Sequence, residues 1–552
     1  MERRLFFCCL VQALFGMILP MRLAGAIPEL KHLYPAGGGA GQSMTVVSIG
    51  KFDPWPPQAF VNDAGIQLKA MKEKNQWLVT IDTDVEPGPK LVRFFNDEGA
   101  SNPALFVVDP RDAHHETDVE PNDGHRGAQS IKTMPCIIEG RLDKRGDVDS
   151  FAVWLEKGTS LVAQLDAFNL GSTMDALLQL RDVQGQQLCF NHDDIHFDPF
   201  LSWTAQYTGL HVIQVMGFEY PAKADIRLGG GEGYLYRLHL TRGPYVRGFL
   251  PLALPQAGDP SLHLVGWNLA ESHLPLSVLS SDPDYRNLIR AWPKGCLTER
   301  YEPNYASSGK APPPPFGITF NLRRQSEPWV FPFAVQKNEH VQLKANTLVT
   351  EGVCDLWMEI ADPNGKAITS DDDSNGRYNP KLTWKAPETG TYQARLHVRA
   401  LNTPLPAYAR FSIKPVLPRP ELTVTGHTFR ISTEDELEIK LQWKRKNGYD
   451  KMGTVFLTGL PKGIHCEAQP VPDKDGELIL KLNTDQNVSP SNSEFEIWYQ
   501  ENDSEARVPV EADLVSSGIN NGVPQGFPEL MIKRTNKLWL TVYLQSEKQE
   551  KD

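Results

Sequence analysis

Two stretches of this chain match each other and alternate apolar with polar residues: MDALLQLRDVQG at residues 174–185 and CDLWMEIADPNG at residues 354–365. Apolar side chains at every second position are typical of a strand that buries one face. The closing sequences DVQG and DPNG favour tight turns, because Asp, Asn and Gly supply the backbone conformations that turns need. The two stretches therefore predict the same strand and turn, used twice.

Further matches extend this repeat in both directions. LSWTA at residues 201–205 corresponds to LTWKA at residues 382–386, and the EPN sequence at residues 120–122 recurs at residues 302–304. All of these pairs lie 180 to 182 residues apart. A nearly constant spacing is the signature of a duplicated unit. We call the first copy module 1, residues 113–242, and the second copy module 2, residues 298–418.

The remaining chain predicts strands as well. LYP at residues 33–35 and FLP at residues 249–251 begin a second, weaker repeat whose later copy is shortened, and LEIKLQW at residues 437–443 alternates strictly. Gly and Pro number 43 each, which favours many turns over long helices. We therefore expect an all-β fold of tandem β-sandwiches. The expected units, after a leader at 1–26, are 27–112, module 1 at 113–242, a short β-rich segment at 243–297, module 2 at 298–418, and 419–545.

The N-terminus predicts export. Two arginines precede the apolar run from Leu5 to Leu19, and AGA follows at residues 24–26, which together resemble a secretory signal peptide at residues 1–26. A short N-terminal membrane anchor is the alternative. No second apolar run approaches the length of about 20 residues that spans a bilayer, so we expect no transmembrane segment in the mature chain. The expected location is periplasmic, at the cell surface, or secreted.

Charge and cysteine content exclude some classes of partner. Asp and Glu outnumber Lys and Arg by 68 to 56, and no long basic stripe interrupts this background, so nucleic acid is not an expected partner. Five cysteines follow the predicted signal peptide, far apart and without a C-x-x-C pair. Neither a disulfide framework nor a thiolate zinc site is expected, and we interpret them as isolated thiols.

Several motifs of the two modules resemble the bacterial pre-peptidase C-terminal domain. In module 1 these are EPND (120–123), GDVDSF (146–151), the Asp175 strand, NHDD (191–194) and GLH (209–211). In module 2 they are EPN (302–304), the Asp355 strand, DDD (371–373) and GTY (390–392). The resemblance implies jelly-roll-like β-sandwiches that accompany secreted peptidases and large exported bacterial proteins. NDEGAS at residues 96–101 resembles the immunoglobulin-like domains found beside them, so we expect the other units, including 243–297, to be immunoglobulin-like.

An acidic segment supplies the best candidate site. In ETDVEPND (116–123) the alternate side chains would share one face of an extended chain, and crowded carboxylates need a cation or solvent to relieve their repulsion. Calcium takes about six to eight oxygen ligands. The resemblance agrees, because collagen-binding relatives of the family hold calcium with this segment. The candidate ligands are Glu116, Asp118, Glu120, Asn122, Asp123, Asp147 and Asp149. A solvated acidic linker is the alternative.

Module 2 lacks most of these side chains. In the sequence alignment Asp118 becomes Arg300, Asp123 becomes Tyr305, and the region of Asp147 and Asp149 becomes residues 329–331. We therefore expect calcium in module 1 only. Next to the acidic segment, His114 and His115 are adjacent, and adjacent side chains of an extended chain point apart. We interpret them as part of a surface linker rather than a transition-metal site.

No catalytic motif was found: G-x-S-x-G, H-E-x-x-H and the P-loop are all absent from the sequence. We therefore expect a non-catalytic exported binding or scaffold protein of the bacterial envelope that recognises polysaccharide or protein. Trp154, Trp203, Trp357 and Trp384 are candidate platforms, although the matched positions of Trp203 and Trp384 favour core packing. The alternatives are a secreted hydrolase or peptidase-associated protein with an unrecognised site in the first or last sandwich, and a collagen-like binding role.

Overall fold

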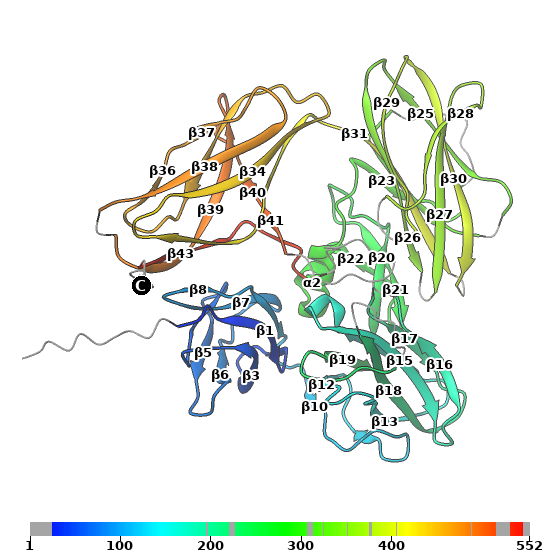
Figure 1. Ribbon diagram of the computed structural model, residues 1–552. Helices are drawn as coiled ribbons and strands as arrows, with labels where there is room; N and C mark the ends of the chain where they lie inside the picture. The colour runs from blue at the N-terminus through cyan, green and yellow to red at the C-terminus, as the bar shows by residue number, and fades with distance from the viewer. Residues whose placement is uncertain are drawn as a thin grey trace, which may run out of the picture.

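The computed structural model describes residues 25–194, 197–219, 227–305, 313–323, 325–349, 352–374, 378–403, 406–486, 488–514 and 530–544. The predicted signal peptide lies outside these residues except for Gly25 and Ala26. Strands make up nearly all of the regular structure, and they pair into facing sheets (Figure 1). The predicted all-β fold of tandem β-sandwiches is therefore confirmed.

The first sandwich packs two sheets around a core that contains Trp77, Phe94 and Phe106. One sheet has the order β1 (Glu29–Tyr34), β3 (Ser43–Lys51), β6 (Gln76–Ile81), β5 (Ile66–Ala70). The other has the order β2 (Gly37–Gly39), β9 (Ala104–Asp109), β7 (Gly88–Asn96), β4 (Gln58–Val61), and β8 (Gly99–Ala100) pairs with β7. Strand β9 ends at Asp109, where the chain passes into module 1.

Module 1 has two five-stranded sheets. The first has the order β10 (His115–Thr117), β12 (Cys136–Arg141), β19 (Leu235–Thr241), β14 (Ser160–Asp166), β17 (Phe200–Thr204). The second has the order β11 (Gln129–Ile131), β13 (Asp149–Leu155), β18 (Gly209–Glu219), β15 (Met174–Asp182), β16 (Gln187–Asn191). Strand β10 runs parallel to β12, so the acidic segment leaves the sheet at one end of the sandwich.

Module 2 repeats this strand order. Its first sheet has the order β23 (Thr298–Tyr301), β24 (Phe316–Asn321), β31 (Ala407–Pro415), β26 (His340–Val349), β29 (Lys381–Lys385). Its second sheet has the order β25 (Trp329–Val335), β30 (Gly390–Asn402), β27 (Val353–Ala361), β28 (Ala367–Asp371). Only a counterpart of β11 is missing among its described residues. The duplication read from the sequence therefore corresponds to one topology, used twice.

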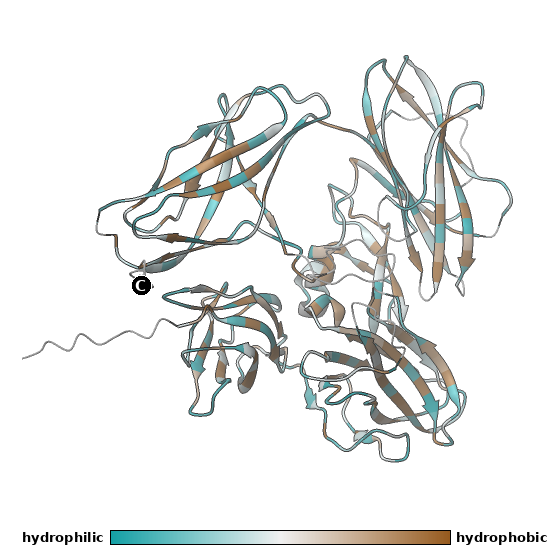
Figure 2. Ribbon diagram, viewed as in Figure 1, coloured by the Kyte–Doolittle hydropathy of each residue, from teal (hydrophilic) through white to brown (hydrophobic). Residues whose placement is uncertain are grey.

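The two stretches that define the repeat also agree in detail. Strands β15 and β27 both have a register shift at matched positions, after Leu180 and after Ile360. The side chain of Asp182 accepts hydrogen bonds from the N–H groups two and four residues on, at 2.9 and 2.8 Å, and Asp362 does the same at 2.9 Å. Figure 2 shows the alternation of apolar and polar residues along such strands. The apolar side chains of β27 face the core.

The segment at 243–297 differs from the immunoglobulin-like unit expected there. It has a single sheet, β20 (Tyr245–Leu250), β21 (Ser261–Trp267) and β22 (His273–Pro275), followed by helices α1 (Leu276–Ser281) and α2 (Pro283–Ala291). The segment is too short to build two sheets, so the helices supply the second layer. Leu279 and Ile289 on the helices pack in one core with Phe249 on β20. None of the helices in the described stretches is long and apolar enough to span a membrane.

The last sandwich again packs two sheets. One has the order β32 (Arg419–Val424), β34 (Leu437–Lys446), β38 (Gly476–Thr484), β36 (Ile464–Cys466). The other has the order β33 (Thr428–Ser432), β43 (Leu538–Tyr543), β39 (Ser491–Glu501), β35 (Gly453–Thr458), β37 (Gln469–Pro470). Strand β40 (Arg507–Val510) pairs with β39. Trp443 and Tyr499 lie at the centre of its core, with rings 5.4 Å apart.

The last sandwich contacts the first, so the chain closes on itself. The Trp539 ring on β43 lies 5.1 Å from the rings of Phe60 and Phe95. Arg93 donates a hydrogen bond of 2.5 Å to the Thr428 hydroxyl, although the two residues are 335 positions apart. In Figure 1 the last sandwich, in orange, lies above the first, in blue, with β43 next to β8. The five units therefore form a closed arrangement rather than an open string.

Candidate metal centre

The acidic segment of module 1 is fixed to the end of the sandwich by hydrogen bonds. The N–H of Asp118 donates to the Glu139 carbonyl at 3.1 Å, which continues the β10–β12 pairing by one residue. Asn122, which is 1% exposed, donates from Nδ2 to Asp118 at 2.6 Å and accepts from the Ser150 N–H at 3.2 Å. Because Ser150 is the second residue of β13, Asn122 holds the segment against the start of that strand.

Five of the seven predicted residues converge there. Asp118, Glu120 and Asp149 each place a carboxylate oxygen within 4.8 Å of the other two, and so do Glu120, Asp123 and Asp147. Glu120 belongs to both groups, so the five carboxylates form one cluster. The carboxylates come from two places in the sequence, the segment after β10 and the residues that lead into β13, and the fold brings these together. We call these five residues the acidic cluster.

The cluster gathers buried carboxyl groups with little positive charge beside them. Asp147 and Asp149 are 0% exposed. Burial, reinforced by the negative charge of Asp118, raises the pKa of Asp149 to about 9. Burial also raises the pKa of Asp118 to about 6. The nearest cation that the structure describes is Lys144, whose Nζ lies 3.8 Å from Asp123 and 3.9 Å from Asp147 and whose side chain is 67% exposed.

Three oxygens of the cluster accept no hydrogen bond from any described residue: Glu120 Oε1, Asp147 Oδ1 and Asp149 Oδ1. Buried polar atoms without partners are uncommon and costly. Tyr236 satisfies the other oxygen of Asp149, to which its hydroxyl donates at 2.5 Å. The donor set consists of carboxylates without His or Cys, which suits calcium and not zinc. The residues present therefore fit a calcium ion.

The other two predicted ligands have different partners. Glu116 lies outside the cluster and accepts from His114 Nε2 at 2.9 Å. Asn122 lies within reach, but both ends of its amide are engaged by Asp118 and Ser150. Asn122 is therefore a positioning residue. Alternation along an extended chain predicted one shared face for both residues. Glu116 instead stays in β10 beside His114, ahead of the bend in the EPND sequence.

Module 2 has aromatic packing where module 1 has the cluster. Trp329 occupies the position of Asp149, since it begins β25 as Asp149 begins β13. Tyr305 stacks on Phe331 at 4.8 Å and donates to the Val330 carbonyl at 3.1 Å. None of the acidic groups in the described part of module 2 forms a comparable cluster.

Strand pairing also corrects the alignment of the two modules. The N–H of Glu302 donates to the Thr319 carbonyl as that of Asp118 donates to Glu139, so Glu302 takes the place of Asp118. Arg300 instead takes the place of Glu116 and pairs with Glu302 at 2.9 Å. The correspondence of Asp118 with Arg300 was therefore wrong by two positions, because the EPN motif lies at different distances from the strand before it.

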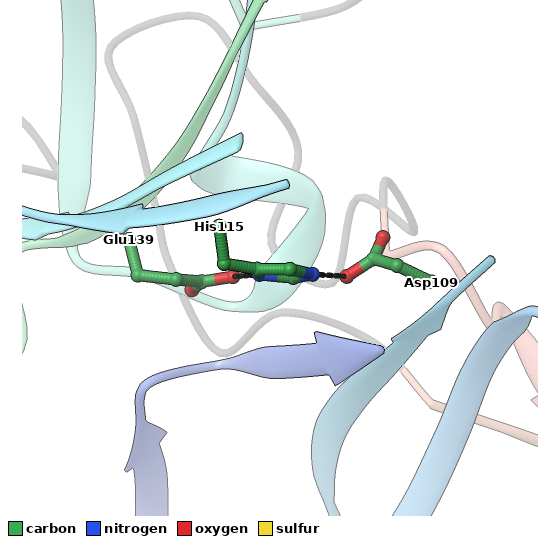
Figure 3. Close-up of side chains that lie close together, drawn as sticks. All are labelled: Asp109, His115 and Glu139. Carbon is green, nitrogen blue, oxygen red and sulfur yellow. Dashed lines mark ion pairs between the residues drawn. The ribbon is translucent and has the colours of Figure 1, made fainter. Parts of the chain in front are cut away.

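A second group, Asp109, His115 and Glu139, lies where the first sandwich meets module 1 (Figure 3). The His115 ring lies between the two carboxylates, 3.4 Å from Asp109 and 3.9 Å from Glu139. Arg237, which is 0% exposed, donates to Glu139 at 2.7 Å and also to Asp109. The guanidinium already binds both carboxylates and offsets one of their negative charges, so this group does not resemble a metal centre. We call these four residues the joint.

The joint was not found from the sequence. His115 is only 17% exposed, which corrects the interpretation of His114 and His115 as a surface linker. Burial lowers its pKa. The first sandwich contributes further contacts, since the Ala36 N–H donates to Glu139 at 3.2 Å and the Tyr34 hydroxyl donates to the Glu139 carbonyl at 3.3 Å. That carbonyl also accepts from Asp118, so the joint and the acidic cluster are directly connected.

No protein-family model matches this chain. A search of curated proteins found no match either. Among solved structures, Sidekick-1 immunoglobulin domains 1–4 share 10% identity over 86% of this chain and 95% of that chain, with a TM-score of 0.20. The insect immune protein hemolin shares 9% identity over 88% and 99%, with a TM-score of 0.22.

A third similar structure is the Bacteroides ovatus protein SGBP-B, from a mixed-linkage glucan utilization locus and in complex with a heptasaccharide. It shares 9% identity over 69% of this chain and 73% of that chain, with a TM-score of 0.15. These values are too low to carry a function from any of the three proteins to this chain.

Proposed function

We propose that this chain is a non-catalytic, exported binding or scaffold protein, and that calcium held by module 1 stiffens its connection to the first sandwich. One observation carries the proposal. Three buried carboxylate oxygens, on Glu120, Asp147 and Asp149, accept no hydrogen bond from the described residues. Asp118 of the same cluster donates its N–H to the Glu139 carbonyl in the joint, so an ion bound by the cluster would act next to the contact between two units.

Asp118, Glu120, Asp123, Asp147 and Asp149 would hold the ion. Calcium supplies positive charge and no reaction: it removes the repulsion among these carboxylates and favours the folded state by mass action. At a hundredfold excess over the dissociation constant this linkage is worth about 2.7 kcal/mol. The resemblance to pre-peptidase C-terminal domains supports the same ligand segment.

The closed arrangement of units supports a scaffold role. The buried pairs of Arg237 with Asp109 and Glu139 fix module 1 to the first sandwich. Trp539 fixes the last sandwich to the first through Phe60 and Phe95. Such contacts hold surfaces of different units in constant relative positions. The partner that we propose is a polysaccharide or an extracellular protein.

A thermal melt of the full chain in calcium and in chelator tests the calcium step. We expect calcium to raise the melting temperature of the wild type and of Glu302→Gln, a carboxyl-to-amide change in module 2 at the position that corresponds to Asp118. Asp149→Asn should melt at the same temperature with and without calcium, because it removes a ligand from the cluster. An equal calcium shift in Asp149→Asn, or no shift in the wild type, would contradict the proposal.

The non-catalytic assignment has its own test. Purified protein should release no products from casein or from a panel of polysaccharides, while binding at least one of them or an extracellular matrix protein. Hydrolysis that persists after repeated purification would replace this proposal with the hydrolase alternative.

A further inference from the structure

A cleft of about 680 Å³ lies between module 1 and module 2. One wall is formed by residues 190–194, at the end of β16 and in the loop after it. The other wall is formed by residues 347–349 and 352–354 together with Tyr378 and Asn379 of module 2. This volume lies within the range of about 300 to 1,000 Å³ that ligand sites occupy. The two modules therefore form one concave surface together.

Each wall carries an exposed aromatic ring. Phe190 is 45% exposed and Tyr378 is 42% exposed, although large apolar side chains are usually buried. The fold does not require Phe190, because Ser370 takes the matched place in module 2: Phe190 pairs with Gln179 as Ser370 pairs with Glu359. Tyr378 has a φ of 59°, a conformation that bulky residues seldom adopt. Neither ring is explained by packing alone.

The charged side chains of the lining are paired with one another. Arg247 on β20 pairs with Asp194 and lies 4.4 Å from the centre of the Phe200 ring. Its positive charge is therefore engaged. His192 and Asp193 pair at 3.0 Å. Arg247 is the one Lys or Arg among the described lining residues, and the chain as a whole has a formal charge of −12, so the cleft disfavours phosphate, sulfate and uronate groups.

The backbone of the cleft is poorly suited to an added peptide strand. The strands that line it contribute only short stretches: Phe190 and Asn191 of β16, residues 347–349 of β26 and residues 353–354 of β27. The stretch of β26 pairs with β31 along one edge, and its Thr347 N–H donates to the Asn379 side chain at 3.1 Å, so little backbone is left to pair with an extended peptide. The Asn191 side chain moreover accepts from the Phe200 N–H at 3.3 Å, which ties this end of β16 to β17. A lining that combines two exposed aromatic residues with carboxylate and amide groups suits a ligand with apolar faces and a hydroxyl rim.

We propose that this cleft binds a neutral glycan chain, whose pyranose faces stack on Phe190 and Tyr378 and whose hydroxyl groups hydrogen-bond to polar side chains such as Asp193 and Asn379. The inference rests on the proposed binding function and specifies a neutral glycan as the class of ligand that is bound. Aromatic rings are well suited to such a role because they offer a large rigid apolar face at little cost in conformational entropy.

Affinity electrophoresis of the full chain tests the inference. The gels contain a soluble β-glucan, a galactomannan, an α-glucan, or polygalacturonate as the anionic comparison. We expect at least one neutral polysaccharide to retard the wild type. Phe190→Ala and Tyr378→Ala should each weaken that binding by about tenfold, as expected for the loss of one buried aromatic contact. Tyr207→Ala is the control, since Tyr207 is an exposed aromatic residue of module 1, 38% exposed, and does not line the cleft.

The outcomes separate this inference from the function on which it rests. If a neutral polysaccharide is bound equally by the wild type and both cleft variants, the cleft assignment is wrong while the binding function stands. If polygalacturonate or a peptide is bound through Phe190 and Tyr378, the ligand class is wrong. If the protein binds neither glycan nor protein partner, the binding function itself fails.

Discussion

Asp149 is a fully buried carboxyl group with few hydrogen-bond donors around it. It is 0% exposed, one of its oxygens has only Tyr236 as a donor, and its pKa is raised to about 9 by burial and by Asp118. Without a metal the folded chain therefore holds a proton that the unfolded chain releases near pH 4. The stability that this proton supplies is complete below about pH 4 and is lost as the pH rises toward 9.

This linkage predicts a calcium-dependent pH profile. In chelator, the melting temperature of the wild type should fall from pH 5 to pH 9 more steeply than that of Asp149→Asn, which has no proton to release. Calcium replaces the proton and should flatten the wild-type profile. Melts at a series of pH values, with and without chelator, measure both slopes. Parallel profiles for the wild type and Asp149→Asn in chelator would show that this carboxyl group does not titrate as described.

Part of the acidic cluster could be predicted residue by residue. Like-charged side chains in a short segment, followed by Asp147 and Asp149, were enough to propose five groups that do converge. Alternation grouped Glu116 with the other carboxylates, although Glu116 lies within β10 and bonds to His114. Composition could not show that both ends of the Asn122 amide are bonded to neighbouring residues. The Arg237 joint had no local signal, because the two partners of Arg237 come from two distant strands, β9 and β12.

Strands with strict alternation were predicted from the sequence, whereas the two short helices were not. The repeat of β15 in β27 extends to the register shift and to the Asp-headed turn, since both are set by local residues. Helix α2 did have a signal: Tyr285, Leu288, Ile289 and Trp292 follow the helical spacing after Pro283. One short helix among many strands is easily missed, because its stability comes from packing against β20 and β21 rather than from local preference.

The order of units along the chain was predictable, whereas their closed arrangement was not. Internal repeats fix which sandwich follows which. The contact of Arg93 with Thr428 joins residues 335 positions apart, and such a contact produces no periodic pattern in the sequence. In the structure, Trp539 marks the contact between the two sandwiches: it is 2% exposed, yet it belongs to no core cluster of its own sandwich. A large apolar side chain at such a position needs a partner from another unit.

The closed arrangement should depend on this tryptophan. Trp539→Ala removes its contacts with Phe60 and Phe95, and Arg93→Ala removes the hydrogen bond to Thr428 beside it. We expect each variant to increase the radius of gyration measured by small-angle X-ray scattering. Trp498→Ala is the control, since its indole bonds within the last sandwich, to Thr458 and Glu496. Unchanged scattering for both Trp539→Ala and Arg93→Ala would contradict the closed arrangement.

The central claim for the whole molecule is that one of two sibling modules holds calcium and the other does not. Equilibrium dialysis of the full chain against radioactive calcium counts the ions directly. We predict one tightly bound ion per chain for the wild type and for Glu302→Gln, and none for Asp149→Asn. No bound ion in the wild type, or a bound ion that survives Asp149→Asn and is lost in Glu302→Gln, would contradict the account.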